Sequence, residues 1–368
     1  MTYWIVNIAA LAAICILLTG FVIPQILLIA FRRHLFDEPD GRKIHHSEVP
    51  RLGGIAFKPV IFFAIALMLG VNIALGYGDF LSEARHHALP ISFGFCSIMI
   101  LYLVGIADDL IGVRYRAKFF TQMICGIMLI AGGVWLDDLH GILSIHSIPE
   151  WLGYPLTLLV IVFIINAINL IDGIDGLASG LCSIAFLFYG VSFFMYHYYF
   201  YSMLSFAALG VLIPFFCYNV FGNPERQRKI FMGDTGSLTI GMLLCFLSIE
   251  LAEGIPQDEQ SINPMALAFV PMFIPCFDVM RVFMHRIRNN ENPFMPDQNH
   301  IHHKLLALGL NQRRVMVSIV AASLLFTLLN IYLSMYLNIN WIFFGSLSLY
   351  TIFNIWLTGK IKKSGRKS

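Results

Sequence analysis

Residues 166–180 read NAINLIDGIDGLASG and separate two long apolar runs of the sequence. Within this stretch, Asn169, Asp172 and Asp175 are spaced three residues apart, so a helical segment would place them roughly on one stripe. The glycines beside them allow the backbone to approach a ligand closely. Because ionisable groups at the end of a membrane helix usually mark a site, we expect a functional site here rather than a simple polar turn.

Composition indicates a membrane protein. The 368 residues are 58% hydrophobic and only 12% charged, whereas a soluble domain carries about 25% charged residues. The first apolar run lacks a basic segment before it and a clear cleavage site, so we expect a spanning helix rather than a removed signal peptide. All seven cysteines lie in apolar runs without a CxxC pair, which predicts small buried side chains rather than a disulfide or zinc framework.

A spanning helix needs about 20 apolar residues, so the sequence predicts an all-α, polytopic membrane protein with about eleven transmembrane helices. We expect residues 1–368 to form one membrane-embedded domain, because no soluble domain, low-complexity segment or internal repeat is evident. The predicted spans lie near residues 3–31, 54–76, 90–107, 119–136, 154–171, 177–196, 203–221, 236–253, 264–284, 315–337 and 341–359.

Basic residues predict the orientation of these spans. Of the 24 Lys and Arg residues, all but Arg85 lie on or next to one face, which receives the C-terminal tail and the loops near 32–53, 108–118, 169–176, 222–235 and 285–314. The positive-inside rule makes this face cytoplasmic, with the N-terminus outside and the C-terminus inside. The basic tail also suits contact with anionic membrane lipid. We expect the polar residues of these loops to converge on one cytoplasmic site.

The first cytoplasmic loop combines cations with a pair of glycines. Lys43, His46 and Arg51 precede Gly53 and Gly54, where the next helix begins. Basic side chains beside such a turn at a helix N-terminus suit a phosphate. A loop that merely fixes the topology would also carry positive charge, but it would not need the paired glycines.

Carboxylates and an amide stand at three further helix ends. The adjacent Asp108 and Asp109 repel each other, which makes one of them a candidate base, and together they are also candidate ligands of a divalent cation. Asp234, in the sequence GDTGS, is either a ligand or a helix N-cap. Asn219 ends the preceding helix and is a candidate ligand for a metal or a base. As cations surround them, these acids predict Mg²⁺-dependent phosphoryl transfer to a lipid phosphate.

The longest cytoplasmic loop carries the histidines His300, His302 and His303 after Arg286 and Arg288. A His-x-His-His pattern leaves zinc binding open. However, no cysteine accompanies the histidines, and neighbouring arginines would repel a metal that arrives without an anion. Histidines among arginines more often hold phosphates or transfer protons.

Together these loops resemble the polyprenyl-phosphate N-acetylhexosamine-1-phosphate transferases of the WecA/TagO type. The matching motifs, in family order, are DEPDGRKIHHSEVPRLGG, GIADDLIG, NAINLIDGIDGLASG, KIFMGDTGS and PDQNHIHH. The resemblance implies a bacterial inner-membrane enzyme that transfers a sugar 1-phosphate from a UDP-N-acetylhexosamine to undecaprenyl phosphate. It further implies release of UMP, a requirement for Mg²⁺ or Mn²⁺, and the initiation of a lipid-linked glycan of the cell envelope. We expect no nucleic-acid partner, and a homodimer remains open.

The resemblance also implies roles for single residues. Asp108 or Asp109, preferentially Asp108, takes the proton from the lipid phosphate, and Asp234 together with Asp172 holds the metal. Residues implied in binding the nucleotide are Asn169, Asp172 and Asp175, with Asn219 and Phe231 at the uracil. Residues implied at the diphosphate or the sugar are His300, His302, His303, Arg286 and Arg288, and the basic first loop contributes Lys43, His46 and Arg51.

Three alternatives remain open. The related muramoyl-pentapeptide transferases share the acids but usually read His-His-His where this chain has His300-Ile301-His302-His303, so a UDP-N-acetylhexosamine, most often UDP-N-acetylglucosamine, is the expected donor. A secondary transporter would place its acids near the bilayer midplane. Here the acids cluster at the cytoplasmic ends of the apolar runs, apart from Asp278, which we interpret as the i, i+3 partner of Arg281. A non-enzymatic lipid-binding scaffold would not need all of the carboxylates. Direct attack by the lipid phosphate is preferred over a covalent phospho-enzyme.

Overall fold

The computed structural model describes residues 1–35, 49–255, 262–292 and 299–363. Within these ranges all regular elements are helices, and β-structure is limited to one isolated bridge between Asp138 and Ser147. The predicted all-α class is therefore confirmed.

The helices follow one another along the chain with short connections. The first half contains α1 (Thr2–Arg33), η1 (Gly53–Ala56), α2 (Phe57–Ala74), α3 (Asp79–His86), α4 (Ala88–Ile111), α5 (Tyr115–Ala131), η2 (Ile142–Ser144), α6 (Glu150–Ile171) and α7 (Leu177–Met195). The second half contains α8 (Tyr199–Phe221), η3 (Pro224–Arg226), α9 (Gly233–Gly254), α10 (Pro264–Phe269), η4 (Val270–Met272), α11 (Phe273–Arg288), α12 (Ile301–Ala307), α13 (Gln312–Ser334) and α14 (Ile339–Lys363).

In the described part of the chain, 10 helical segments are long and apolar enough to cross a membrane, and they match ten of the predicted spans. The remaining prediction, near 119–136, corresponds to α5, which has 17 residues and is therefore only about 25 Å long. Its neighbours α4 and α6 both end at the start of α9, because Asp109 and Asn169 both contact Asp234 there. Between α4 and α6, the chain must therefore return to the opposite end of the bundle through α5 and the segment that follows it.

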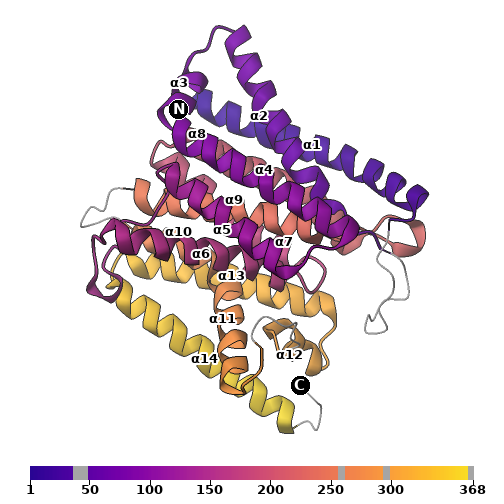
Figure 1. Cartoon of the computed structure of the whole chain (residues 1–368), viewed down its shortest axis with the longest axis vertical. Helices are drawn as coiled ribbons and strands as arrows, with labels where there is room; N and C mark the ends of the chain where they lie inside the picture. Colours follow the sequence, from indigo (N-terminus) through magenta and orange to yellow (C-terminus); the bar gives the residue numbers. More distant parts are fainter. Residues whose placement is uncertain (36–48, 256–261, 293–298, 364–368) are drawn as a thin grey trace.

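Two short helices and one break were not predicted. Helices α3 and α12 have only 8 and 7 residues, too few apolar positions for a clear hydropathy signal. The single span predicted at 264–284 is divided into α10, η4 and α11, with Pro271 inside η4. Proline removes a backbone donor and bends a helix. As a result α11 crosses the neighbouring helices at a steep angle (Figure 1).

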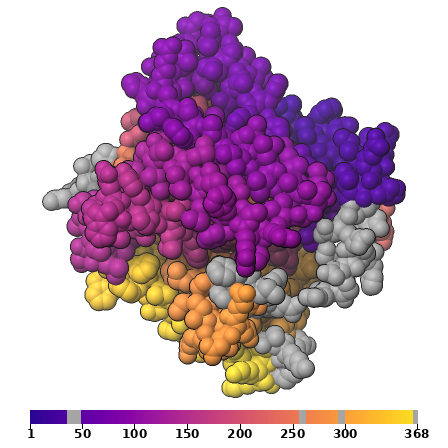
Figure 2. Space-filling view, viewed as in Figure 1, coloured from indigo at the N-terminus to yellow at the C-terminus, as the bar shows by residue number. Residues whose placement is uncertain are grey.

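Helix α9 lies at the centre of the bundle. It is the most completely buried of the ten spans, and it packs against α4, α6, α7 and α10. A helix that is apolar on all sides belongs in such a core. The N-terminal helices cover one edge of the molecule and α13 and α14 the opposite edge (Figures 1 and 2). The polar start of α9 is therefore presented at one end of the bundle and surrounded by other helix ends.

The cysteine prediction is partly wrong. Cys15, Cys125, Cys182 and Cys245 are buried and Cys276 is partly buried, but Cys96 and Cys217 are exposed on the outer surfaces of α4 and α8. An apolar run does not distinguish the face of a spanning helix that meets other helices from the face that meets lipid, so the sequence could not separate the two groups.

The segment before α2 is fixed to the start of α9 through its backbone. Gly53 N donates to Phe231 O, Gly54 N donates to Met232 O, and Phe231 N donates to Pro50 O, each at 2.9 Å. The amides of Gly53 and Gly54 are therefore already used within the fold, and phosphate binding by the basic side chains of this loop stays a prediction. The glycines serve to let two backbones approach, because a Cβ atom on Gly54 would lie 2.0 Å from Gly236 N.

We expect Gly54→Ala to lower the melting temperature of the purified protein in detergent by several degrees, or to prevent folding. Backbone atoms cannot move aside easily, and overpacking of this kind costs about 1–3 kcal/mol or more. Gly70→Ala in α2 is the matched control, because no atom lies within 4 Å of its added Cβ. Equal melting temperatures for both variants would contradict the close contact between the two segments.

Candidate active site

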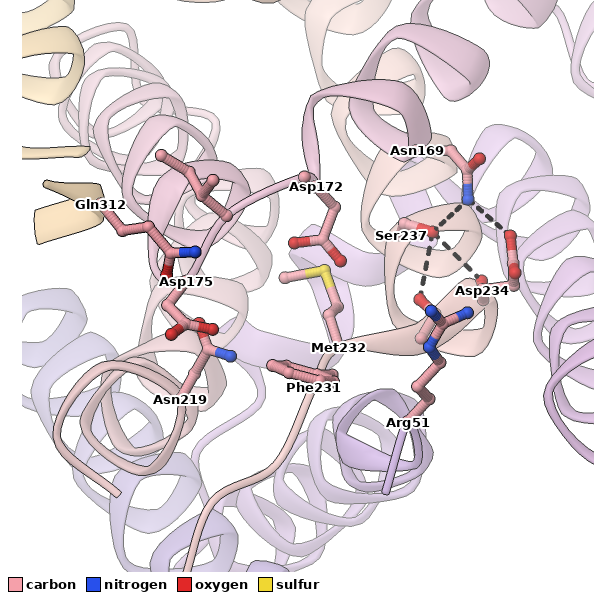
Figure 3. A pocket seen from close by; sticks show the side chains of 13 residues that line it. Arg51, Asn169, Asp172, Asp175, Asn219, Phe231, Met232, Asp234, Ser237 and Gln312 are labelled. Atoms are coloured by element: carbon pink, nitrogen blue, oxygen red, sulfur yellow. Dashed lines mark hydrogen bonds between the residues drawn. The ribbon is translucent and has the colours of Figure 1, made fainter. Parts of the chain in front are cut away.

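A cavity of about 320 Å³ opens where α6, α8 and α9 end or begin. It brings together seven of the residues singled out in the sequence and adds polar residues that were not (Figure 3). The predicted lining residues are Arg51, Asn169, Asp172, Asp175, Asn219, Phe231 and Asp234. The additional polar residues are Ser237 and Gln312. Loops far apart in the sequence thus converge on one site, as expected.

The central acidic motif is a turn rather than a helical stripe. Helix α6 ends at Ile171, and the chain turns through residues 172–176 before α7 begins. Gly176 ends the turn with φ 78°, a left-handed conformation that favours glycine. The segment after Ile171 is not helical, so no single helical face carries the three residues, yet Asn169, Asp172 and Asp175 line the same cavity because the turn folds around it.

Asn219 holds this turn in place. Its Oδ1 accepts a hydrogen bond from Gly176 N at 2.6 Å, and its Nδ2 donates to Ile230 O at 2.9 Å. Both polar ends of the buried amide therefore bind backbone groups. The role of Asn219 at uracil stays a prediction. In the structure, the residue joins the acidic turn to the segment before Phe231.

The two adjacent aspartates have different surroundings. Asp109 accepts hydrogen bonds from Asp234 N at 2.8 Å, from Thr235 N at 2.9 Å and from the Thr235 hydroxyl at 2.5 Å, so it caps the N-terminus of α9 from α4. Asp108 instead accepts from Val113 N at 2.6 Å and pairs with Lys118 Nζ at 2.8 Å. Of these two aspartates, only Asp108 pairs with a cationic side chain.

Asp234 occupies the second residue of α9 and makes no capping hydrogen bond with its own helix. Its Oδ1 accepts from Asn169 Nδ2 at 2.6 Å and lies 3.5 Å from Lys118 Nζ. Asn169 Nδ2 also donates to Ser237 Oγ at 2.8 Å. Lys118 therefore lies between Asp108 and Asp234. Its positive charge offsets part of the negative charge of the three neighbouring carboxylates.

Asp172 lies close to the same group of carboxylates. Burial raises the pKa of its carboxyl to about 7, and the charges of Asp234 and Asp175 act in the same direction, whereas Arg51 opposes them. These surroundings therefore favour the uncharged form of Asp172. A cation in the cavity would favour the ionised form.

The opposite side of the cavity combines a cation with an aromatic ring. Lys229 Nζ pairs with Asp175 Oδ2 at 2.5 Å and lies 5.7 Å from the centre of the Phe231 ring. The ring of Phe231 lies at the cavity wall, and the Arg51 side chain extends toward Asp234 and Ser237 (Figure 3). A flat ring beside positive charge suits a base that is joined to phosphate groups.

The cavity has oxygen donors that fit a hard divalent cation. Asp172 and Asp234 supply carboxylates, and Ser237 and Asn169 add neutral oxygens nearby. Among the residues that the structure describes, no group of three His, Cys, Asp or Glu side chains is close enough to hold a metal alone. Mg²⁺ commonly binds through one or two carboxylates plus substrate phosphates, so this donor set fits Mg²⁺ or Mn²⁺ bound together with a diphosphate.

The histidine segment reaches the cavity through one residue. His302 is fully buried, and a Cβ atom on Gly173, which lines the cavity, would lie 2.4 Å from His302 Nε2. Burial lowers the pKa of His302 to about 3, with His303 and His300 acting in the same direction, so its ring is neutral. The His302 and His303 rings lie 4.1 Å apart, whereas His300 is bound to Asp278 at 2.9 Å.

Of the remaining predicted cations, two lie away from the cavity and two lie outside the described residues. Arg286 Nη1 donates to Asn292 O at 2.7 Å, and Arg288 is exposed at the end of α11. Neither side chain lines the cavity. Lys43 and His46 lie outside the described residues.

The sequence did not single out Lys118, Lys229, Ser237 or Gln312 as site residues. The two lysines belong to basic runs of the sequence, and only the fold shows which lysine faces an acid. Ser237 follows Asp234 by three residues, one helical turn, and that spacing was a usable signal. Gln312 begins α13 and had no recognisable motif.

Comparison with known proteins places the chain in a family. Residues 91–252 match the model of glycosyl transferase family 4. The chain is 31% identical to a probable undecaprenyl-phosphate N-acetylglucosaminyl 1-phosphate transferase of Bacillus subtilis over 86% of this chain and 82% of the relative. It is 28% identical to undecaprenyl-phosphate alpha-N-acetylglucosaminyl 1-phosphate transferases of Yersinia pestis, over 82% of this chain and 78% of the relative, and of Escherichia coli K12, over 81% and 76%.

We expect Asp109→Asn to lower the melting temperature in detergent by several degrees and Asp108→Asn to lower it much less. Asp109 accepts three hydrogen bonds at the start of the central helix, and bonds to a charged acceptor contribute about 1.5–3 kcal/mol each. The side-chain amide of asparagine would also place an NH2 donor opposite backbone N–H groups that are themselves donors. Thermal unfolding of the two variants under identical conditions tests this, and similar losses for both would contradict the capping role.

Proposed function

Because this chain belongs to glycosyl transferase family 4, alongside undecaprenyl-phosphate N-acetylglucosaminyl 1-phosphate transferases, we propose that it transfers N-acetylglucosamine 1-phosphate from UDP-N-acetylglucosamine to undecaprenyl phosphate. The observation that carries this proposal is the convergence of Asp108, Asp172 and Asp234 with Lys118 and an aromatic wall at the ends of membrane-spanning helices. Acids and cations at one membrane-facing site suit phosphates on both substrates.

The reaction exchanges one phosphorus–oxygen bond for another. An oxygen of the lipid phosphate attacks the β-phosphorus of the UDP-sugar, and the bond from that phosphorus to the bridging oxygen breaks. UMP leaves with the bonding electron pair, and the sugar stays joined to the lipid through a diphosphate. The chain needs to position the two phosphates and balance their charge, which is most of the catalysis in such transfers.

Asp108 is the proposed acceptor of the proton from the lipid phosphate. It stands at the end of α4 with Lys118 at 2.8 Å, and its neighbour Asp109 is occupied by the cap of α9. Lys118 lies between Asp108 and Asp234, so it faces both the proposed proton acceptor and the proposed metal-binding acid. Direct attack needs no covalent intermediate on the chain.

The nucleotide and metal share the cavity in this proposal. Phe231 stacks on uracil while Lys229 and Arg51 face the phosphates. His302, buried behind Gly173, supports the wall that faces the diphosphate or the sugar. Asp234 and Asp172 hold Mg²⁺ or Mn²⁺, which when bound would neutralise charge on the diphosphate. The site then lies at the cytoplasmic face of the bacterial inner membrane, with the N-terminus outside, in line with the distribution of basic residues.

Release of UMP by the full-length protein in detergent tests the function. We expect release that requires undecaprenyl phosphate and Mg²⁺ together, with UDP-N-acetylglucosamine the best of several UDP-sugars. The UDP-muramoyl pentapeptide as best donor would favour the related branch. No UMP from any donor, with folded and Mg²⁺-loaded protein, would contradict the transferase and favour a transporter.

Asp234→Asn tests the metal-binding assignment. We expect UMP release to fall by about a hundredfold or more at every Mg²⁺ concentration, because an amide is a poorer ligand for a hard cation and carries no charge. The control is Asp79→Asn at the start of α3, an exposed acid that does not line the cavity. Turnover near that of the unmodified protein at saturating Mg²⁺ would remove Asp234 from the metal site.

A further inference from the structure

Asp278 is a buried carboxylate that lies outside the cavity and contacts its own helix α11 and two other parts of the chain. Its side chain has no exposed surface. Oδ1 accepts hydrogen bonds from Arg281 Nη2 at 2.8 Å and from the Tyr350 hydroxyl at 3.0 Å. Oδ2 contacts His300 Nδ1 at 2.9 Å, and both oxygens lie 3.0–3.1 Å from Ile301 N. The predicted pairing with Arg281 is confirmed, but it is only one of four contacts.

These contacts fix the beginning of the histidine segment. Ile301 is the first residue of α12, and His300 precedes it. Arg281 donates a second hydrogen bond to Asn299 O, so three consecutive residues are tied to α11. A carboxylate that receives the first amide of a helix determines where that helix starts and in which direction it runs.

The position of α12 determines where His302 lies. The His300 and His302 rings are nearly parallel, at 6° and 5.7 Å between centres. His302 in turn presses against Gly173 in the acidic turn, with Nε2 closest. Neither ring nitrogen of this buried histidine has a hydrogen-bond partner among the described residues. Asp278 is thus connected to the cavity wall through a single short segment.

The C-terminal helix holds the other side of the same segment. Tyr350 of α14 reaches Asp278, and Lys304 of α12 donates to Asn354 Oδ1 at 3.4 Å and to Thr358 Oγ1 at 3.1 Å on α14. Burial lowers the pKa of Lys304 to about 8, with Arg281 acting in the same direction. Helix α14 contributes no residue to the cavity lining, yet it contacts both Asp278 of α11 and Lys304 of α12.

We propose that Asp278 is a positioning residue, which, together with α14, sets the place of His302 against the acidic turn. A carboxylate inside a membrane span usually marks a function. Here four donors satisfy it, so it acts through the histidine segment rather than on a substrate. A merely structural role would affect the amount of folded protein but would not depend on His302. This positioning role rests on the proposed function.

The first test compares Asp278→Asn, Tyr350→Phe and Ser346→Ala in the full-length protein. We expect Asp278→Asn to lower kcat/KM for UDP-N-acetylglucosamine about tenfold or more, as removal of a supporting partner commonly does, and to leave the KM for undecaprenyl phosphate unchanged. Tyr350→Phe removes one donor and should give a smaller loss of the same kind. Ser346→Ala is the control, because this α14 hydroxyl binds Asn330 and not Asp278.

A double-mutant cycle with His302→Ala separates positioning from stability. If Asp278 acts through His302, the loss caused by Asp278→Asn should largely disappear in the His302→Ala background. The proposal would be overturned if the losses in kcat/KM of the two single variants simply multiply in the double variant. It would also be overturned if the KM of both substrates changed equally.

Hydrogen exchange supplies a readout that does not need turnover. Asp278→Asn should speed exchange of amides in residues 299–308 and leave α6 and α9 protected, whereas exchange like that of the unmodified protein would overturn the positioning role. If the unmodified protein releases no UMP, the proposed function fails, and the exchange result still decides whether Asp278 holds the histidine segment.

Discussion

The cap that Asp109 places on the N-terminus of α9 is the contact on which the rest of the site depends. It joins the end of α4 to the start of the most buried helix, and Asp234 is the residue whose amide it binds. The segment before α2 pairs with the residues just before α9, and Asn169 at the end of α6 contacts Asp234. Three distant loops therefore meet at one helix start, where exposed amides favour negative charge.

The buried acids divide into two kinds. The oxygens of Asp109 and Asp278 accept several hydrogen bonds from the fold itself, so these two carboxylates are already engaged. Asp172 and Asp234 stand close to other carboxylates, with Arg51 and Lys118 opposing only part of their charge. A cation that binds together with a phosphate substrate would balance the charge that the protein leaves unbalanced in this cavity. This difference separates the residues that build the site from those that act in it.

Local sequence patterns predicted the spans and the helix ends that carry acids, because hydropathy and charge report how each segment meets the membrane. They could not show which groups pair across the chain. Gly53 and Gly54 were interpreted as a phosphate turn but bind backbone oxygens, and Asn219 is engaged at both ends of its amide. Lys118 became recognisable only once the fold brought α5 beside Asp234. Glycine pairs and basic runs have several uses, and tertiary contacts decide among them.

The most direct test of this account is a crystal structure of the protein with Mn²⁺ and UDP, in which anomalous scattering locates the metal. The account predicts one Mn²⁺ in the cavity, with an oxygen of Asp234 and a phosphate oxygen each at about 2 Å, and with the uracil ring on Phe231. A metal bound at the histidine cluster, or bound nucleotide in the cavity without a metal at Asp234, would contradict the central claim.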